Sequence, residues 1–358
     1  MNETSSTEKM KDLGEKQFLR NVLPGLYVDP RLVGGFGHDS AVIDLPNLPF
    51  NLIQKIDRAS HPVSVKRGWS GYRTWGQMAV TANCSDILAS GGTPVACMLA
   101  VIIQGNELAS NVADIIYGAA EECRRNEIIY AGGDTKEGSA NVIGSVVGTV
   151  PKDGFLPRNA ARPGDELYCA GLIGGFAGAY FMLENVLKGQ RNDEADEYIA
   201  YLSSPIAQWE VAKRVNSRRL AHCGMDASDG VLDVLQTFAS PGVRIEINLD
   251  EIPYHRFALT CAEQTRIPLT QLIFGGGDWN ILYCISKDLA GHVESLRKES
   301  WPIFRIGRVV EGSGVFAIDH HGREFRIEGS INEHFAIRIE DAADFMDLLK
   351  NGNYLRDA

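Results

Sequence analysis

Apolar residues in the first 150 positions occur in two kinds of run. Continuous apolar runs of strand length predict strands over 40–45, 51–56, 94–103, 128–131 and 141–150. Apolar residues at helical spacing predict helices over 13–26, 69–90 and 108–125, and the last of these has the clearest apolar stripe. The first half of the chain is therefore expected to combine a sheet with a few long helices.

The segment 151–157 (Pro-Lys-Asp-Gly-Phe-Leu-Pro) is rich in turn-forming residues and predicts a domain boundary. Beyond it we expect strands over 166–170, 243–249, 279–285 and 303–328, with helices near 171–185, 190–220 and 336–358. Strands and helices do not alternate strictly, which predicts two α+β domains rather than a Rossmann sheet. The expected organisation is a disordered leader (1–12), an N-terminal domain (13–151), a C-terminal domain (152–335) and an additional helix or tail (336–358).

Composition narrows the classes of function. A chain of 358 residues with 44% hydrophobic and 23% charged residues is typical of a two-domain globular protein. The net charge of -11 argues against binding to nucleic acid or to an anionic membrane. The sequence has no apolar run of about 18 residues and begins with the polar stretch MNETSSTEKMKD, so neither a membrane span nor a signal peptide is expected. The seven cysteines form no C-x-x-C pair, which predicts buried reduced thiols in a cytoplasmic protein.

Aspartates beside glycines or other small residues recur next to apolar segments. Six segments share this pattern: Gly37–Ser40, Lys55–Asp57, Asn83–Asp86, Gly132–Thr135, Asp226–Gly230 and Gly275–Asp278. A strand that closes with Gly-Gly-Asp lets the backbone approach a ligand while a carboxylate points toward it. Converging carboxylates repel one another unless cations lie between them, and Mg²⁺ is the cation that prefers such oxygen ligands beside phosphates. Each aspartate alone could equally cap a helix or a turn.

Taken in order, these segments resemble the PurM-like superfamily of ATP-binding enzymes, and most closely its thiamine-monophosphate kinases. The resemblance spans about 13–335. It rests on motifs similar to G-D-D-A-A-V (37–42), N-x-S-D-I-A-A-x-G-G-x-P (83–94), G-G-D-T (132–135), R-x-x-A-x-P-G-D (158–165), D-x-S-D-G-L (226–231), G-G-E-D-Y (275–279) and a terminal H-F (334–335).

The resemblance implies an N-terminal domain that dimerises through its sheet, and ATP bound between that domain and a C-terminal α/β domain. Mg²⁺ ligands would be Asp39, Asp57, Asp86, Asp134 and Asp229. Contacts to the nucleotide would come from Asp39, Gly132, Gly133, Thr135, Lys136 and Ser228, and the catalytic set would be Asp134, Asp229 and Arg158. The small-molecule acceptor, a phosphate or a carboxylate, would meet Asp57, His61, Arg67, Asp278 and Trp279.

Three departures fall at functional positions of the family pattern. His38 replaces the first carboxylate of G-D-D, and Gly277 replaces the glutamate of G-G-E-D-Y. The segment 58–73, where the kinases have a stretch similar to M-L-V-E-G-V-H-F, is more basic and contains Lys66, Arg67 and Arg73. ATP binding is therefore better supported by the sequence than recognition of thiamine.

Three functions stay open at this point. The first is ATP- and Mg²⁺-dependent phosphoryl transfer to thiamine phosphate or to an altered acceptor, in which positioning and electrostatics supply the catalysis. The second is a PurM-type synthase or cyclase that activates an amide or carboxyl oxygen by phosphorylation and then releases phosphate. The third is a nucleotide-binding protein without catalytic activity, whose site has lost carboxylates at positions 38 and 277.

Overall fold

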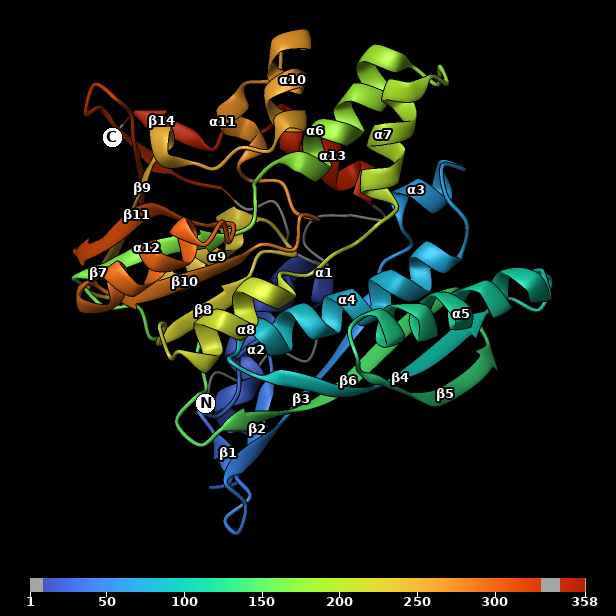
Figure 1. The fold of residues 1–358 in the computed structure, drawn as a ribbon, viewed down its shortest axis with the longest axis horizontal. Helices are drawn as coiled ribbons and strands as arrows, with labels where there is room; N and C mark the ends of the chain where they lie inside the picture. Colours follow the sequence, from blue (N-terminus) through green and yellow to red (C-terminus); the bar gives the residue numbers. More distant parts are fainter. Residues whose placement is uncertain (1–8, 330–341, 358) are drawn as a thin grey trace.

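The computed structural model describes residues 9–329 and 342–357 of the chain. It has two mixed sheets, one in each half of the sequence, and helix α4 (Arg73–Ala89) lies between them (Figure 1). The predicted α+β organisation in two domains is thus confirmed. No helix in these two described ranges is long and apolar enough to cross a membrane.

The N-terminal sheet has six strands in the order β1-β2-β3-β6-β4-β5. Their bounds are β1 Leu32–Val33, β2 Ala41–Ile43, β3 Phe50–Ala59, β4 Thr93–Ile103, β5 Ile129–Glu137 and β6 Asn141–Pro151. All neighbouring strands are antiparallel except β4 and β5, which α5 (Ala109–Arg125) connects in parallel. Helices α4 and α5 pack on one face of the sheet. The short helices α1 (Met10–Leu13), α2 (Glu15–Val22), η1 (Leu23–Gly25) and α3 (Val63–Lys66) complete this half.

The C-terminal sheet has eight strands in the order β14-β13-β12-β9-β11-β7-β10-β8. Its strands are β7 Asp165–Ala170, β8 Cys223–Asp226, β9 Val243–Asn248, β10 Ile281–Ser286, β11 Ile303–Glu311, β12 Gly314–Ile318, β13 Glu324–Ile327 and β14 Leu355–Asp357. Its longer helices are α6 Gly175–Phe181, which continues as the π-helical turn η2 Met182–Leu187, then α7 Asp193–Leu202, α8 Trp209–Ser217, α9 Val231–Phe238, α10 Arg256–Gln264, α12 Ala290–Lys298 and α13 Ala342–Asn351. Shorter turns are η3 Leu249–Glu251, α11 Leu269–Leu272 and η4 Lys287–Leu289.

The two halves share one apolar core through α4. Fourteen of its residues are buried, including Trp75 and Ile87. The same apolar cluster contains Val211 of α8 and Tyr283 of β10. Polar contacts reinforce this junction, since Thr81 Oγ1 donates to Pro205 O at 3.2 Å and Asn216 Nδ2 to Leu88 O at 3.0 Å. The long buried face explains why the helix predicted over 69–90 forms as expected.

Two expectations about the strands were wrong. The segment Gly132–Asp134 does not close a strand, because β5 continues through it to Glu137. The glycine is needed inside the sheet, where a Cβ on Gly133 would lie 1.8 Å from Leu99 O beside an irregularity in the pairing with β4. Asp57 likewise lies within β3 rather than after its end, whereas Asp86 lies on α4, inside the helix predicted over 69–90.

The ends of the chain add detail to the expected organisation. Helix α1 (Met10–Leu13) begins within the segment expected as a leader (1–12), and residues 1–8 lie outside the described part. The helix predicted over 336–358 corresponds to α13, but it is followed by β14, which pairs with β13 at the edge of the C-terminal sheet. The motif at His334 and Phe335 falls outside the described residues.

Candidate functional site

A cluster of carboxylates, buried except for Asp57, lies where the N-terminal sheet, α4 and β8 meet. At its centre the ammonium of Lys55 is 2.9 Å from Asp86 Oδ2 and 3.5 Å from Asp57 Oδ2. Lys55 and Asp57 point from β3 toward α4, because alternate residues of a strand share a face, and Asp86 comes from the last turns of α4. Three residues from two elements thus form a compact ion-paired group.

Two further aspartates complete the cluster from opposite domains. Asp39 precedes β2, is 8% exposed and forms an ion pair with Arg158 Nη1 at 3.2 Å. Asp226 ends β8, is 4% exposed and accepts a hydrogen bond from Ser228 Oγ at 3.1 Å. The second oxygen of each, Oδ2, is buried and accepts no hydrogen bond from the described residues. A buried carboxylate oxygen without a donor is costly, so a cation, a ligand or a proton at these two atoms would stabilise the site.

The carboxylates perturb one another, as expected for groups in a shared low-dielectric site. Burial, and after it the nearby charge of Asp39, raise the pKa of Asp226 to about 7. Burial also raises the pKa of Asp86, with Asp226 as the next cause. Burial alone would lower the pKa of Lys55, but Asp86 and Asp57 outweigh it and raise that pKa. The site therefore carries excess negative charge that Lys55 and Arg158 offset only in part.

The cluster offers carboxylate oxygens that suit a hard divalent cation, but among the described residues it lacks a group of three protein side chains arranged as metal ligands. Mg²⁺ needs only one or two carboxylates when phosphates and water supply its other ligands, and Asp39 Oδ2 and Asp226 Oδ2 are buried and available for it. No group of three His, Cys, Asp or Glu side chains within the described ranges is arranged to hold a metal ion. Two of the nearby carboxylates, Asp57 and Asp86, are engaged by Lys55.

The Gly-Gly-Asp-Thr segment lies apart from this group, on the edge strand β5. The side chain of Asp134 is 64% exposed, and it contacts the backbone N–H of Thr135 and, at 3.6 Å, the ammonium of Lys136. Gly132 has a φ of 99° and open space where a Cβ would lie. The structure thus brings Asp39, Asp57 and Asp86 together, while Asp134, Thr135 and Lys136 form a separate exposed group. Asp229 is close enough to Asp226 to raise its pKa.

The residues expected to meet the acceptor are mostly engaged by the protein itself. The ring of His61 stacks on Trp75, with centroids 4.3 Å apart. Arg67 forms an ion pair with Glu184 at 3.2 Å. Another basic residue of that segment, Arg73, ties α4 to α5 through Asp114, at 2.9 Å, and Glu121. The basic segment 58–73 therefore serves internal ion pairs to a large extent.

Asp278 is a cap within the C-terminal domain. Its Oδ2 accepts from Gly174 N at 2.7 Å, and its Oδ1 accepts from Phe176 N at 2.6 Å and from Tyr201 Oη at 2.9 Å. These donors include the first N–H groups of α6. Burial raises the pKa of Asp278 to about 6, although these hydrogen bonds oppose the shift. Next to it Trp279 has a φ of 53°, a conformation that bulky residues rarely adopt.

Two of the three departures from the family pattern, His38 and Gly277, lie in closely packed surroundings. His38 Nε2 donates to Gly34 O at 3.2 Å, and the ring of His38 meets that of Phe155 edge-on, with centroids 5.2 Å apart. Burial lowers the pKa of His38, which favours the neutral ring. At Gly277, with a φ of 92°, a Cβ would lie 2.6 Å from the ring of Phe176. A glutamate at position 277 would need that ring to move.

Sequence reasoning did not single out two residues of the cluster. The sequence places Asp226 in a motif, but the family resemblance implies Asp229 as the metal ligand of that motif. The end of an apolar β-strand at Asp226 was the available signal. Lys55 gave no signal, because a lysine two residues before Asp57 is typical of a half-exposed strand. Only the approach of α4 buries it.

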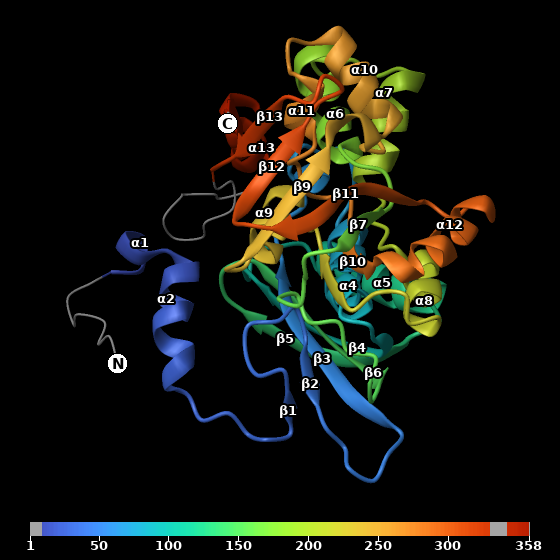
Figure 2. The same cartoon turned by 90° about the vertical axis from the view of Figure 1, so that its left-hand side faces the viewer.

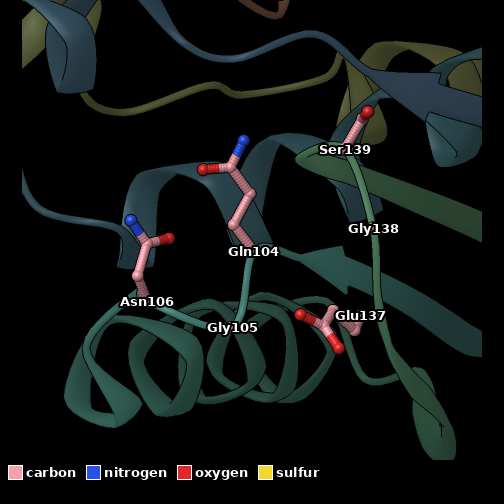
Figure 3. Close-up of a pocket in the computed structure, with 6 residues that line it drawn as sticks. All are labelled: Gln104, Gly105, Asn106, Glu137, Gly138 and Ser139. Atoms are coloured by element: carbon pink, nitrogen blue, oxygen red, sulfur yellow. The ribbon is translucent and has the colours of Figure 1, made fainter.

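A separate recess lies at the far ends of β4 and β5. Figure 3 shows Gln104, Asn106 and Ser139 around it, with the carboxylate of Glu137 on one side. Gly105 and Gly138 complete its lining. A Cβ on Gly105 would meet Glu137 Oε1 at 2.8 Å. The recess has no residue of the carboxylate cluster, so it is not part of the candidate site.

Comparisons with known proteins cover most of the chain. Residues 37–150 match the N-terminal domain of AIR synthase related proteins, and residues 162–320 match the C-terminal domain. The thiamine-monophosphate kinase of Rhodopirellula baltica is 24% identical over 299 residues, which are 80% of this chain and 86% of the relative. That of Methanospirillum hungatei is 28% identical over 279 residues, 76% of this chain and 86% of the relative.

A solved structure described as AaThiL complexed with AMPPCP and TMP superposes with a TM-score of 0.73. It is 23% identical and the match covers 87% of this chain and 96% of the other, so it supports the fold alone. Both halves of the chain thus match the same family, in the same order and over nearly the whole of each domain. The chain belongs to the AIR synthase related (PurM-like) family, and within it is similar to thiamine-monophosphate kinases.

Proposed function

We propose that this protein is an ATP- and Mg²⁺-dependent phosphotransferase that acts on a small-molecule acceptor, in the manner of a thiamine-monophosphate kinase. The observation that carries the proposal is the pair of buried, unpartnered oxygens Asp39 Oδ2 and Asp226 Oδ2, one from each domain. A site that joins two domains and has excess carboxylate charge suits metal-bound polyphosphate. The two kinase relatives favour this function over the PurM-type synthase.

Each part of the cluster has a distinct task in this proposal. Asp39 and Asp226 would hold Mg²⁺, which neutralises charge on the phosphates when bound. Arg158 lies beside Asp39 and would offset charge on the transferred group. Ser228 orients Asp226 through its hydroxyl. In-line phosphoryl transfer needs positioning and electrostatic stabilisation rather than a protein nucleophile.

The acceptor is proposed to be thiamine phosphate or another small phosphate or carboxylate. The ring of Trp69, from the N-terminal half, lies 6.4 Å (centroid to centroid) from the buried ring of Tyr180, from the C-terminal half, near the ion pair of Arg67 and Glu184. Because Glu184 holds Arg67, the guanidinium of Arg67 has a fixed direction. Asp57, His61 and Trp279 stay proposed contacts of the acceptor.

We also propose that the protein is cytoplasmic and dimeric. All seven cysteines are buried and free, which suits a reducing compartment. The face of the N-terminal sheet opposite α4 and α5 exposes Ile56, Met98 and Ile129, at 67%, 52% and 61%. An exposed apolar face of this kind suits a second copy of the chain.

The proposal is tested by ³¹P NMR of the protein with ATP, Mg²⁺ and thiamine monophosphate. Appearance of ADP and of a diphosphate ester is expected. Free inorganic phosphate without a phosphorylated product would instead favour the synthase. ATP that stays intact with thiamine monophosphate and with a panel of phosphates and carboxylates would contradict both, and would favour a non-catalytic binding protein.

Asp226→Asn should lower ATP turnover by at least about a hundredfold, because it removes a charged ligand from the proposed metal site. ADP formation in a coupled assay measures the change. Asp134→Asn is tested alongside it. The side chain of Asp134 is 64% exposed, so this substitution should leave the fold unchanged. Loss of turnover in both variants would place Asp134 in the working site, whereas full turnover in Asp226→Asn would contradict the metal assignment.

A further inference from the structure

Lys55 is placed unlike the other ion-paired lysines of this chain. Its side chain is 19% exposed, whereas Lys152 and Lys213, which also form ion pairs, keep 36% and 43%. It lies on the inward face of β3, between two carboxylates that come from different elements. An ammonium buried to this extent loses much of its hydration, and the two carboxylates compensate for that loss.

Lys55 engages two of the four carboxylates of the cluster. Asp57 and Asp86 are both within salt-bridge distance of its Nζ, at 3.5 and 2.9 Å. Asp39 and Asp226, which Lys55 does not contact as an ion pair, each keep one unpartnered buried oxygen. The cluster is thus divided into a half that Lys55 neutralises and a half that still lacks a cation.

We propose that the ammonium of Lys55 is a built-in cation that takes the place of one divalent metal ion in the carboxylate cluster. The site then binds one metal ion fewer than its aspartates would otherwise hold. This inference rests on the proposed function, since it assumes that the cluster binds metal and nucleotide. Lys55 would also be a fixed positive charge toward the phosphates, positioned before the nucleotide binds.

The test is a count of bound Mn²⁺ by EPR titration, with and without the non-hydrolysable nucleotide AMPPCP. Lys55→Met removes the charge and keeps an unbranched apolar side chain, so Asp57 and Asp86 become available as ligands. We expect Lys55→Met to bind one more Mn²⁺ per chain than the native protein, and its Tm, lowered without metal, to recover when Mn²⁺ is added. Lys152→Met, which breaks an exposed ion pair with Asp44, is the matched control and should leave the count unchanged.

A second variant keeps the inference testable if Lys55→Met does not fold. Lys55→Met/Asp86→Asn removes both partners of the shortest contact, so no unpaired buried charge is left. It should bind as many Mn²⁺ ions as the native protein but bind AMPPCP roughly tenfold more weakly, because one fixed positive charge is lost. Native affinity for AMPPCP in this double variant would overturn the inference and leave Lys55 a purely structural partner of Asp86.

The outcomes separate this inference from the proposed function. If the native protein binds Mn²⁺ and AMPPCP but Lys55→Met binds the same number of Mn²⁺ ions, the inference on Lys55 is wrong and the proposed function stands. If the native protein binds neither Mn²⁺ nor AMPPCP, the proposed function fails, and the inference that depends on it fails too.

Discussion

The carboxylate of Asp278 accepts hydrogen bonds from Gly174 N, Phe176 N and Tyr201 Oη, so it already serves the scaffold. Asp278→Asn should destabilise the protein by about 2 kcal/mol, because its amide NH₂ would face a backbone N–H that then lacks an acceptor. Urea unfolding measures the loss. Tyr201→Phe removes a single donor and leaves the two backbone contacts, so it should cost only about 1 kcal/mol. Unchanged stability in Asp278→Asn, together with lost activity, would instead support a contact with the acceptor.

Individual residues of the site differ in how well their roles could be predicted from the sequence. Asp39 and Asp86 could be singled out because each lies in a family motif, and both are buried in the cluster. The role of Asp278 could not be read from its motif, since a carboxylate beside glycines suits a cap and a ligand equally well. Lys55 could not be found at all, because its burial depends on α4, which is distant in the sequence.

Helices α4 and α5 approach so closely that glycine is required at two facing positions. A Cβ on Gly118 would lie 2.0 Å from Arg73 O, and one on Gly76 would lie 1.9 Å from Ile115 O. Helix propensity alone would make Gly118→Ala stabilising by about 1 kcal/mol. The backbone contact reverses the sign, and we expect a net loss of about 2 kcal/mol in urea unfolding, because the helices must separate.

Gly291 of α12 supplies the matched control for that prediction. Nothing lies within 4 Å of its Cβ position, so Gly291→Ala should stabilise the protein by about 0.5–1 kcal/mol. Stabilisation by both substitutions would contradict the close packing of α4 and α5. The sequence predicted both helices from their apolar spacing, but not their separation. The continuation of β5 through Gly132–Asp134 also could not be predicted from the sequence, because it depends on the pairing of β5 with β4.

At the scale of the whole molecule, the site joins two domains that one helix holds together. Asp39 and Asp86 come from the N-terminal half and Asp226 from the C-terminal half, with α4 packed against strands of both sheets (Figure 2). The shared apolar core that includes Val211 and Tyr283 makes this junction part of the folding unit. The relative placement of the two carboxylate groups is therefore fixed by packing rather than by a flexible linker. The order of motifs predicted two domains, but the sharing of one core across them is visible only in the structure.

The face of the N-terminal sheet opposite α4 and α5 exposes apolar side chains, from which we predict how two copies of the chain associate. Ile56 and Met98 both pair in register with Ser145, so they lie in one row across β3, β6 and β4, and Ile129 extends the apolar face on β5. If a second copy covers this face, Met98→Glu places a charge in an apolar interface and should convert the dimer into a monomer of 39.2 kDa in light scattering. Leu259→Glu, at an exposed apolar position on α10 with 43% exposure, is the control and should stay dimeric. A native protein that is already monomeric at micromolar concentration would rule out this use of the face. Retained ATP turnover in monomeric Met98→Glu would show in addition that one chain supplies the whole site.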